Sequence, residues 1–475
     1  MSFDSVMGKT IYPVKSIAVG CDFISGYAFK GKDFTDADGH PIIKIKNIQD
    51  GKVTIKESQF IPKHLTGKKL EKFKLENGDI LIAMTGQGSV GRVGKLYIST
   101  TETPYLNQRV GKFLVDEENL NKEYLYYVLS CKAYENYLFA AGSGSGQPNL
   151  SPALIKAVEI PYPPYKSQCY IGKILSDLDE KIHLNNQINQ TLESIAQTIF
   201  KSWFIDFEPV RAKIIAKQEG KDTELAAMCA ISGKSEVELQ QMAEDDFAEL
   251  QATAALFPDE FVDSELGEIP KGWEVNSLGN ICNFTPGSAF KPEYQGQTQG
   301  EIPFIKVSDM NLNGNEIFIV KANNYIDNSL QKERKFKLHE EGATVFAKIG
   351  VALISNRRRV LTMPTIIDNN MMSASPLKGL STPYYLYLLL KTIDFNTLVS
   401  GTALPYLNVS DLRKILIVHP TINLLNKFEL IANPLLQKIK LNSVQCEGLV
   451  TLRDNLLPKL LSGEIDASVL NGEHG

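Results

Sequence analysis

The chain has 475 residues, a net charge of −5 and ordinary hydrophobic and charged fractions of 43% and 22%, which allows two to four globular domains. Its N-terminus lacks the pattern of a signal peptide, and no run approaches the roughly 20 apolar residues that cross a bilayer, so we expect a soluble, cytoplasmic protein with no membrane partner. The six cysteines are scattered without a Cys-x-x-Cys pair, which argues against a disulfide framework and against a metal site.

The first part of the chain has the pattern of a mixed domain. From Val14 to Pro161, short strand-like runs such as "PIIKIKNI" and "GDILIAM" alternate with glycines, and one stretch, "NKEYLYYVLSCKAYENYLF", has a helical period. This pattern predicts an α+β fold, and we assign residues 1–165 to a first globular domain.

A long helix follows Pro164. Apolar residues recur there at three- and four-residue steps, and Ser176 is the predicted N-cap. Asn185 interrupts the apolar stripe, as polar residues do where two helices fix their register. The segment "FKSWFIDF" from Phe200 to Phe207 adds more apolar surface than a helix pair can cover, so we expect it to be exposed in the isolated chain.

The segment after this helix is strongly acidic. Residues 219–268 contain 14 acidic residues and two lysines, so the rest of the chain is net positive despite its overall charge. We assign residues 166–270 to a central helical region with an acidic insert and a junction.

The next part of the chain repeats the first. "VKSIAVGCDFISGYAFK" from Val14 and "VNSLGNICNFTPGSAFK" from Val275 align without a gap and share eight of 17 residues, where about one is expected by chance. Further matches follow in the same order, ending with "NLSPALIKAVEIP" from Asn149 against "NVSDLRKILIVHP" from Asn408. The chain therefore holds a duplicated unit of roughly 200 residues, and residues 271–420 form a second globular domain.

The C-terminal part, residues 421–475, repeats the helix. Asn433 is the predicted N-cap, Pro434 the first helical residue, and Asn442 interrupts the apolar stripe at the position equivalent to Asn185. Two such stripes in one chain can bury each other, so we predict an antiparallel, coiled-coil-like pair with Asn185 and Asn442 setting its register. The predicted fold is α+β, with two duplicated globular domains separated by two long antiparallel helices.

This order of domains and motifs resembles the specificity subunit of a type I restriction-modification system. The resemblance covers nearly the whole chain: the "ISGYAFK" and "TPGSAFK" openings, the "GDILI" strand followed by an Asn-Gln pair, the junction "SELGEIPKGWEV" and the closing "LLPKLLSGEI". The second copy departs from it, because Ala343 replaces the aspartate of "GDIL" and Asn369-Asn370 replaces Asn-Gln.

The resemblance implies a non-catalytic chain that reads a bipartite sequence in double-stranded DNA, one half-site per domain. It also implies two methyltransferase subunits and two restriction subunits as partners. S-adenosylmethionine, ATP and magnesium are then expected on those partners, and no cofactor on this chain.

Two other functions deserve comparison: a protein-interaction scaffold without a DNA role, and a fused DNA adenine methyltransferase. "GQGSVG" from Gly86 matches a dinucleotide-binding fingerprint, but a strand-like run follows where a helix is required, so we expect a glycine-rich hairpin. "YPPY" from Tyr162 lacks the amide or acid of the methyltransferase motif, which favours a rigid domain border. The six histidines show no metal-binding spacing.

Candidate DNA-binding residues are basic and amide side chains at strand ends and in glycine loops. Arginine can pair with guanine, and asparagine or glutamine with adenine, through two hydrogen bonds. The candidates in the first domain are Lys44, Lys46, Asn47, Thr85, Gln87, Ser89, Arg92, Asn107, Gln108 and Arg109. Those in the second domain are Lys306, Ser308, Lys348, Arg357, Arg358 and Arg359.

Overall fold

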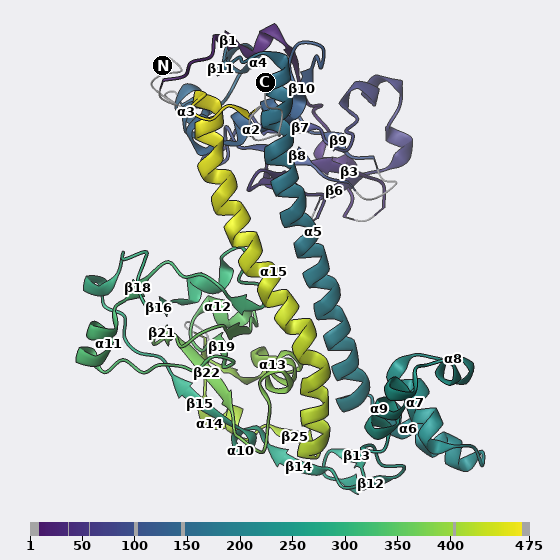
Figure 1. Ribbon diagram of the computed structural model, residues 1–475. Coiled ribbons are helices and arrows are strands. Elements are labelled where there is room, and N and C mark those ends of the chain that lie inside the picture. Colours follow the sequence, from purple (N-terminus) through teal and green to yellow (C-terminus); the bar gives the residue numbers. More distant parts are fainter. Residues whose placement is uncertain are drawn as a thin grey trace. The chain divides into compact units, whose positions relative to one another are not determined.

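A computed structural model describes residues 9–36, 38–56, 58–98, 103–143, 148–401 and 405–467 (Figure 1). The chain forms two compact units, one of residues 1–181 and 449–475 and the other of residues 182–448. Both units mix sheets and helices, and two long helices run through both of them. The predicted α+β fold with two duplicated domains and a long antiparallel helix pair is confirmed.

The first unit contains a six-stranded and a three-stranded sheet. The six-stranded sheet has the order β2-β10-β7-β8-β5-β4, the three-stranded sheet has the order β6-β3-β9, and β1 pairs with β11. The strands are β1 (Val14–Ser16), β2 (Cys21–Ser25), β3 (His40–Ile43), β4 (Ile48–Gln49), β5 (Lys52–Val53), β6 (Gln59–Ile61), β7 (Ile80–Ala83), β8 (Val93–Leu96), β9 (Tyr105–Leu106), β10 (Val110–Val115) and β11 (Glu159–Pro161). The α-helices are α2 (Lys122–Ser130), α3 (Lys132–Gly142) and α4 (Pro152–Lys156). The 3₁₀ turns are η1 (Ile17–Val19), η2 (Gly31–Asp33), η3 (Ile45–Asn47), η4 (Lys63–Leu65) and η5 (Lys68–Phe73).

The second unit repeats this topology. Its five-stranded sheet has the order β15-β22-β19-β20-β17, its three-stranded sheet has the order β18-β16-β21, and β14 pairs with β25. The strands of these sheets are β14 (Glu274–Ser277), β15 (Cys282–Pro286), β16 (Ile302–Ile305), β17 (Phe318–Ile319), β18 (Tyr325–Ile326), β19 (Thr344–Ala347), β20 (Arg359–Leu361), β21 (Ile366–Ile367), β22 (Met371–Pro376) and β25 (Leu416–His419). Two short hairpins are β12 (Phe261–Ser264) with β13 (Gly267–Pro270), and β23 (Val399–Ser400) with β24 (Tyr406–Leu407). The helices are α10 (Leu278–Ile281), α11 (Asn328–Arg334), α12 (Val351–Ile354), α13 (Pro383–Thr392) and α14 (Val409–Arg413), with 3₁₀ turns η6 (Pro292–Tyr294), η7 (Val307–Asn311) and η8 (Phe395–Leu398).

The central strand of each large sheet separates two apolar cores. All four residues of β7 are buried; Ile80 and Ile82 join one core, while Leu81 and Ala83 join the other. Successive side chains of a strand point to opposite faces, so an unbroken apolar run is what a strand covered on both faces requires. β19 is buried in the same way.

The long helices are α5 (Tyr165–Phe204, 40 residues) and α15 (Ile422–Ser462, 41 residues). They begin about a dozen residues before the predicted N-caps. Ser176 and Asn433 are therefore interior residues, and Pro434 lies well inside α15, where it removes one backbone hydrogen bond. No more than three residues separate the start of each helix from the end of the closing strand of its domain, and packing along its length outweighs the local start signals at Ser176, Asn433 and Pro434.

The two helices are antiparallel. In the second unit, the Asn185 amide donates to Gln445 Oε1 (2.8 Å), and the Asn442 amide donates to Asn189 Oδ1 (2.9 Å). In the first unit, Arg453 pairs with Asp179 (2.6 Å). Asn185 and Asn442 are 1% and 3% exposed, so both lie in the seam, although neither bonds to the other. Their role in setting the register stays a prediction.

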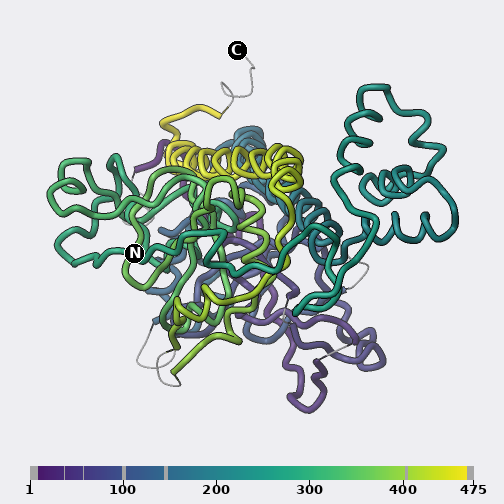
Figure 2. The backbone as a smooth tube through the Cα atoms, turned by 90° about the horizontal axis from the view of Figure 1, so that it is seen from below, coloured from purple at the N-terminus to yellow at the C-terminus, as the bar shows by residue number. Residues whose placement is uncertain are grey.

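The acidic segment belongs to a helical lobe that Figures 1 and 2 show standing apart from the sheets of its own unit. This acidic lobe contains the helices α6 (Glu208–Gln218), α7 (Thr223–Ser232), α8 (Glu236–Gln240) and α9 (Glu244–Ala254). Helices α7, α8 and α9 share a small core of their own, whereas the buried Val210 of α6 belongs to the larger core of the unit. The expectation that "FKSWFIDF" is exposed was wrong: Phe200, Trp203, Phe204 and Phe207 are buried. They pack around aromatic partners that follow this lobe or belong to α15, including Phe257, Trp273 and Phe428.

Candidate nucleic-acid interface

The repeated Gly of "SGYAFK" and "PGSAFK" marks a close crossing of two chain segments. A Cβ on Gly26 would lie 2.2 Å from the carbonyl oxygen of Asn107, and one on Gly287 would lie 2.0 Å from that of Asp368. Tyr27 N donates to Leu106 O (2.9 Å), and Gln108 N donates to Tyr27 O (2.9 Å). Because only glycine fits this crossing, both copies keep it, and it anchors the loops in which the candidate residues lie.

Three loops meet at this end of the first domain. Met84 N donates to Arg109 O (3.0 Å), which joins the glycine loop to the segment after β9. Asn107 N donates to Ile43 O (3.2 Å), which joins the same segment to the end of β3. The exposed candidates at this end are Lys46, Gln87, Gln108 and Arg109.

The glycine loop is a hairpin, as predicted. β7 and β8 pair antiparallel on either side of it, so no helix follows that could hold a pyrophosphate. Gly86, Gly88 and Gly91 all have positive φ, a backbone conformation that glycine adopts without strain. Thr85, Ser89 and Arg92 are half-buried at the base of the hairpin.

Two of the candidate asparagines have structural roles. Asn47 is 2% exposed; its amide donates to Thr54 O (2.9 Å) and Ser58 Oγ (3.1 Å), and its Oδ1 accepts from Lys44 N (2.9 Å). Asn107 is 9% exposed at the glycine crossing. We therefore leave both out of the candidate interface.

Lys44 and Lys306 occupy matching positions before η3 and η7. Lys44 Nζ lies 3.8 Å from the centre of the Phe34 ring and bonds to Gln59, and partial burial lowers its pKa. Lys306 Nζ lies 5.2 Å from the centre of the Phe290 ring and bonds to Gln295. Both lysines are half-buried residues, which places them at the border of the interface rather than on its open surface.

In the second domain, the structure identifies two residues that the sequence alignment misplaced. Asp368 occupies the position of Asn107, since each pairs as an isolated bridge with the residue after the crossing glycine. Asn369 and Asn370 therefore match Gln108 and Arg109, and both are exposed.

Two further candidates of the second domain lie near these asparagines. Lys348 N donates to Asn370 O (2.8 Å), as Met84 N does to Arg109 O, so half-buried Lys348 joins this group. Ser308 is exposed at the end equivalent to Lys46.

The three consecutive arginines do not act as a set. Arg358 is 3% exposed: its guanidinium lies 3.5 Å from the centre of the Phe395 ring and donates to Ile393 O (3.0 Å), and burial lowers its pKa to about 9. Arg359 is half-buried and donates to Arg358 O (2.8 Å). The prediction that all three face DNA is thus corrected, because Arg358 supports the fold and only Arg357 is exposed.

The segments that follow the central strands β7 and β19 differ in chemistry between the two domains. Where the first domain has the polar hairpin with Gln87, the second has the short helix α12, which presents Val351 (79% exposed) and Ile354 (52% exposed). An apolar side chain in the major groove can contact the methyl group of thymine, whereas an amide cannot make an equivalent contact.

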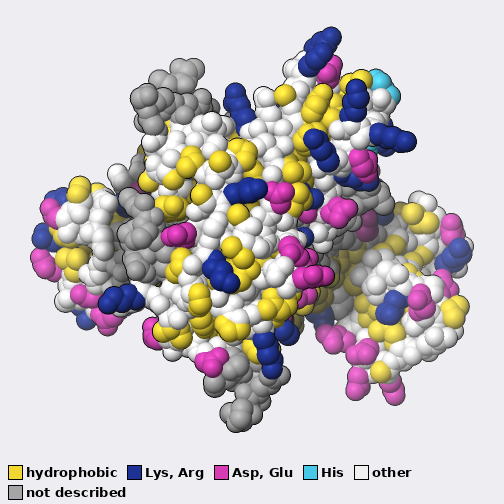
Figure 3. Space-filling view, turned by 90° about the horizontal axis from the view of Figure 1, so that it is seen from above, with side chains coloured by type: hydrophobic (Ala, Val, Ile, Leu, Met, Phe, Trp, Pro, Cys, Tyr) yellow, Lys and Arg dark blue, Asp and Glu magenta, His cyan; other side chains and the backbone are white. Residues whose placement is uncertain are grey.

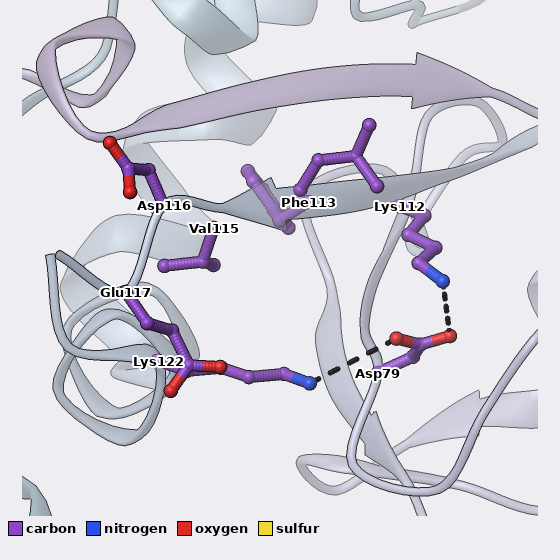
Figure 4. A pocket seen from close by; sticks show the side chains of 8 residues that line it. Asp79, Lys112, Phe113, Val115, Asp116, Glu117 and Lys122 are labelled. Carbon is purple, nitrogen blue, oxygen red and sulfur yellow. Dashed lines mark ion pairs between the residues drawn. The ribbon is translucent and has the colours of Figure 1, made fainter.

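Asp79, the aspartate of "GDIL", links a strand and a helix of the first domain. Figure 4 shows Asp79 between Lys112 of β10 (2.6 Å) and Lys122 of α2 (4.0 Å), and Asp79 Oδ2 also accepts from Glu76 N (2.8 Å). In the second domain Ala343, Ser373 and Pro383 stand at the three matching positions, so the whole cluster is replaced together. The departure from "GDIL" thus reflects a different core, in which Ser373 Oγ bonds to His339 Nδ1 (2.7 Å).

Within the described residues, no group of three or more His, Cys, Asp or Glu side chains could hold a metal ion. In the same part of the chain, no helix is long and apolar enough to cross a membrane.

The chain resembles known proteins over most of its length. The family model described as "Type I restriction modification DNA specificity domain" matches residues 17–194 and 270–424. The HindI specificity subunit of Haemophilus influenzae is 34% identical, covering 82% of this chain and 87% of the relative. The MjaIX specificity subunit of Methanocaldococcus jannaschii is 29% identical, covering 81% and 77%. A crystal structure of a type I S subunit from M. genitalium has the same fold, with a TM-score of 0.54 and 16% identity over 95% of this chain and 96% of that one.

Proposed function

Because the chain belongs to the family of type I restriction-modification DNA specificity subunits, we propose that it reads a bipartite DNA target, with one half-site for each duplicated domain. As a specificity subunit it has a recognition role and not a catalytic one. The observation that carries the bipartite proposal is the repetition of one loop arrangement: both domains use a crossing glycine to hold exposed amide or basic side chains at the same end of the sheets.

The two half-sites should differ in sequence. Gln87, Gln108 and Arg109 offer hydrogen bonds in the first domain, whereas Val351 and Ile354 add apolar contacts in the second. Amides and arginine favour adenine and guanine, and apolar groups favour thymine. We therefore expect the second domain to discriminate thymine by its methyl group more strongly than the first.

We also propose that the long helices bind the partner subunits. In the second unit, α15 leaves Leu430, Leu441 and Val444 exposed, and α5 leaves Leu184 and Ile195 exposed. Residues three or eleven positions apart share one helix face, so these side chains form apolar stripes that the helix pair itself does not cover. Helices of two methyltransferase subunits would bury such stripes, and two restriction subunits would complete the cytoplasmic complex.

In this assembly the chain needs no cofactor of its own. S-adenosylmethionine, ATP and magnesium belong to the partner subunits. A scaffold without a DNA role would show no preference among duplexes, and a fused methyltransferase would bind S-adenosylmethionine as an isolated chain, so both alternatives can be tested directly.

The test of modular reading is a domain exchange. The pairing of β1 with β11 closes the first domain, so residues 14–161 can be replaced by the recognition domain of another specificity subunit. Genome-wide mapping of methylated adenines should show one half of the motif changed and the other retained. The matched exchange of residues 275–419, bounded by β14 and β25, should change the opposite half. If either exchange alters both halves or neither, the domains do not read DNA independently.

The helix proposal is tested by co-purification. Leu441→Arg with Val444→Arg should abolish capture of the methyltransferase subunit, because charges would enter the buried stripe. Ile215→Arg with Val237→Arg, two similarly exposed apolar residues of the acidic lobe, should leave capture unchanged. Equal capture by all variants would assign the subunit contact to another surface.

A further inference from the structure

Each domain carries a basic segment directly after the outer strand of its three-stranded sheet. In the first domain, residues 62–74 ("PKHLTGKKLEKFK") follow β6 and contain five lysines and one acidic residue. In the second, residues 328–337 ("NSLQKERKFK") follow β18 and contain four basic residues and one acidic residue. Both segments end in the tripeptide Lys-Phe-Lys and differ in the residues before it. Neither was among the residues predicted to bind DNA.

The two basic segments are equivalent in topology. β6 pairs antiparallel with β3, which pairs parallel with β9; likewise β18 pairs antiparallel with β16, which pairs parallel with β21. Each basic segment then leads to the central strand of the large sheet, β7 or β19. The first is built of the 3₁₀ turns η4 and η5 and the second of helix α11, so different local structures place positive charge at the same position of the fold.

The basic side chains point to solvent and are little neutralised. Lys63, Lys68 and Lys69 are exposed, and no ion pair is found for them within the part of the chain that the structure describes. Lys332, Lys335 and Lys337 are exposed and likewise lack an ion pair among the described residues. Figure 3 shows Lys and Arg side chains gathered over the lobe of the first three-stranded sheet, at the upper right. In a chain with a net charge of −5, such clustering is not a consequence of composition.

Both basic segments pack next to the candidate reading loops. In the first domain, the Phe73 ring lies 5.5 Å from the ring of Tyr27, whose carbonyl accepts from Gln108 N (2.9 Å). In the second, the Phe336 ring lies 5.3 Å from that of Phe304, next to Ile305, whose carbonyl accepts from Asp368 N (2.9 Å). A duplex whose bases reach these loops would therefore bring its backbone close to the lysines.

We infer that residues 62–74 and 328–337 bind DNA phosphates in each half-site without reading the sequence, which positions the duplex for the loops that do. The inference rests on the proposed function, and it assigns the two tasks to different segments. Ammonium and guanidinium groups at an exposed surface attract the phosphate backbone equally for every sequence, whereas hydrogen bonds to base edges distinguish sequences.

The test uses the full chain in complex with its methyltransferase subunits. One variant carries Lys63, Lys68, Lys69 and Lys72 changed to Gln, and a second carries Lys332, Arg334, Lys335 and Lys337 changed to Gln. The matched control changes Lys201, Lys217, Lys221 and Lys234 to Gln, which removes the same charge from exposed positions of α5 and the acidic lobe. Affinity is measured against salt for a duplex with the methylated motif and for a duplex of arbitrary sequence.

Each of the two variants should flatten the slope of log K against log salt by up to about 3 to 4 units, since each lost phosphate contact removes about 0.9. Motif and arbitrary duplexes should lose affinity by the same factor, and the mapped methylation motif should be unchanged. The control should keep the wild-type slope.

Two results would overturn the inference: an unchanged slope or a changed methylation motif. An unchanged slope that comes with loss of methyltransferase co-purification would assign the lysines to an acidic surface of the partner. Failure of the proposed function looks different, because the wild-type complex itself would then bind motif and arbitrary duplexes equally.

Discussion

Replacing the crossing glycine of one domain with alanine should disable that domain alone. The Cβ of Gly26→Ala would lie 2.2 Å from the Asn107 carbonyl oxygen, where ordinary contact begins at about 3.4 Å, so the two segments must separate by roughly 1 Å. The clashing oxygen belongs to the backbone, so no side-chain rotation can relieve the clash.

The cost follows from the hydrogen bonds at the crossing. Gly26 N donates to Val110 O (3.0 Å), Tyr27 N to Leu106 O (2.9 Å) and Gln108 N to Tyr27 O (2.9 Å). At about 1 kcal/mol for each bond, losing all three would lower the free energy of unfolding of the first domain by about 3 kcal/mol. The loop with Gln108 and Arg109 would also lose its anchor.

The variant is assayed by urea unfolding and by mapping methylated adenines. We expect Gly26→Ala to weaken selection of one half of the motif and to leave the other half intact. Gly287→Ala, whose Cβ would lie 2.0 Å from the Asp368 carbonyl oxygen, should do the converse.

The matched control is Gly31→Ala, because no atom lies within 4 Å of a Cβ at Gly31. It should change neither stability nor motif. If Gly26→Ala unfolds like wild type and keeps both halves of the motif, the crossing does not position the reading loops.

Two further predictions concern the second domain. Arg358→Ala should lower the free energy of unfolding by about 3 kcal/mol, because it removes a buried cation–π contact and buried hydrogen bonds. Arg357→Ala should leave the free energy of unfolding unchanged and reduce the salt slope of DNA binding by about one unit. The opposite pattern in urea unfolding and salt titration would reverse the roles of the two arginines. Burial lowers the pKa of His339 from 6.5 to about 4, so stability should be fully present above pH 6.5 and fall by about 3 kcal/mol as the pH drops toward 4, because the unfolded chain takes up the proton first. His339→Gln should remove this part of the pH dependence of urea unfolding, and an unchanged profile would show that other groups cause it.

The duplication could be predicted from the chain alone because its signals are local. Short runs such as "GDILIAM" are apolar at every position when a strand is covered on both faces, and the long helices show their period over many turns. The glycine of "SGYAFK" and "PGSAFK" recurs because a backbone carbonyl occupies the space of its side chain. The seam asparagines were also found this way, since Asn185 and Asn442 interrupt an otherwise apolar stripe.

The alignment of the two copies, residue by residue, depended on tertiary contacts that the local sequence pattern does not contain. The sequence alignment paired Ser151 with Ser410, but the structure shows that Ser151 and Asn408 are the equivalent N-caps, of α4 and α14. Both residue types cap helices, so only the pairing of the closing strands, Val14 with Pro161 and Val275 with Val418, decides the register.

The charge or polarity of a single residue did not show whether its side chain faces solvent or packs inside its own domain. Arg357 and Arg358 are adjacent and identical in type, yet one is exposed and the other stacks on Phe395, which lies far along the chain. Asn47 has the side chain of a base-reading residue, but its amide closes a turn in its own domain. A polar side chain has the same donors and acceptors in both settings, and whether it meets DNA or its own backbone depends on which distant segments pack against it.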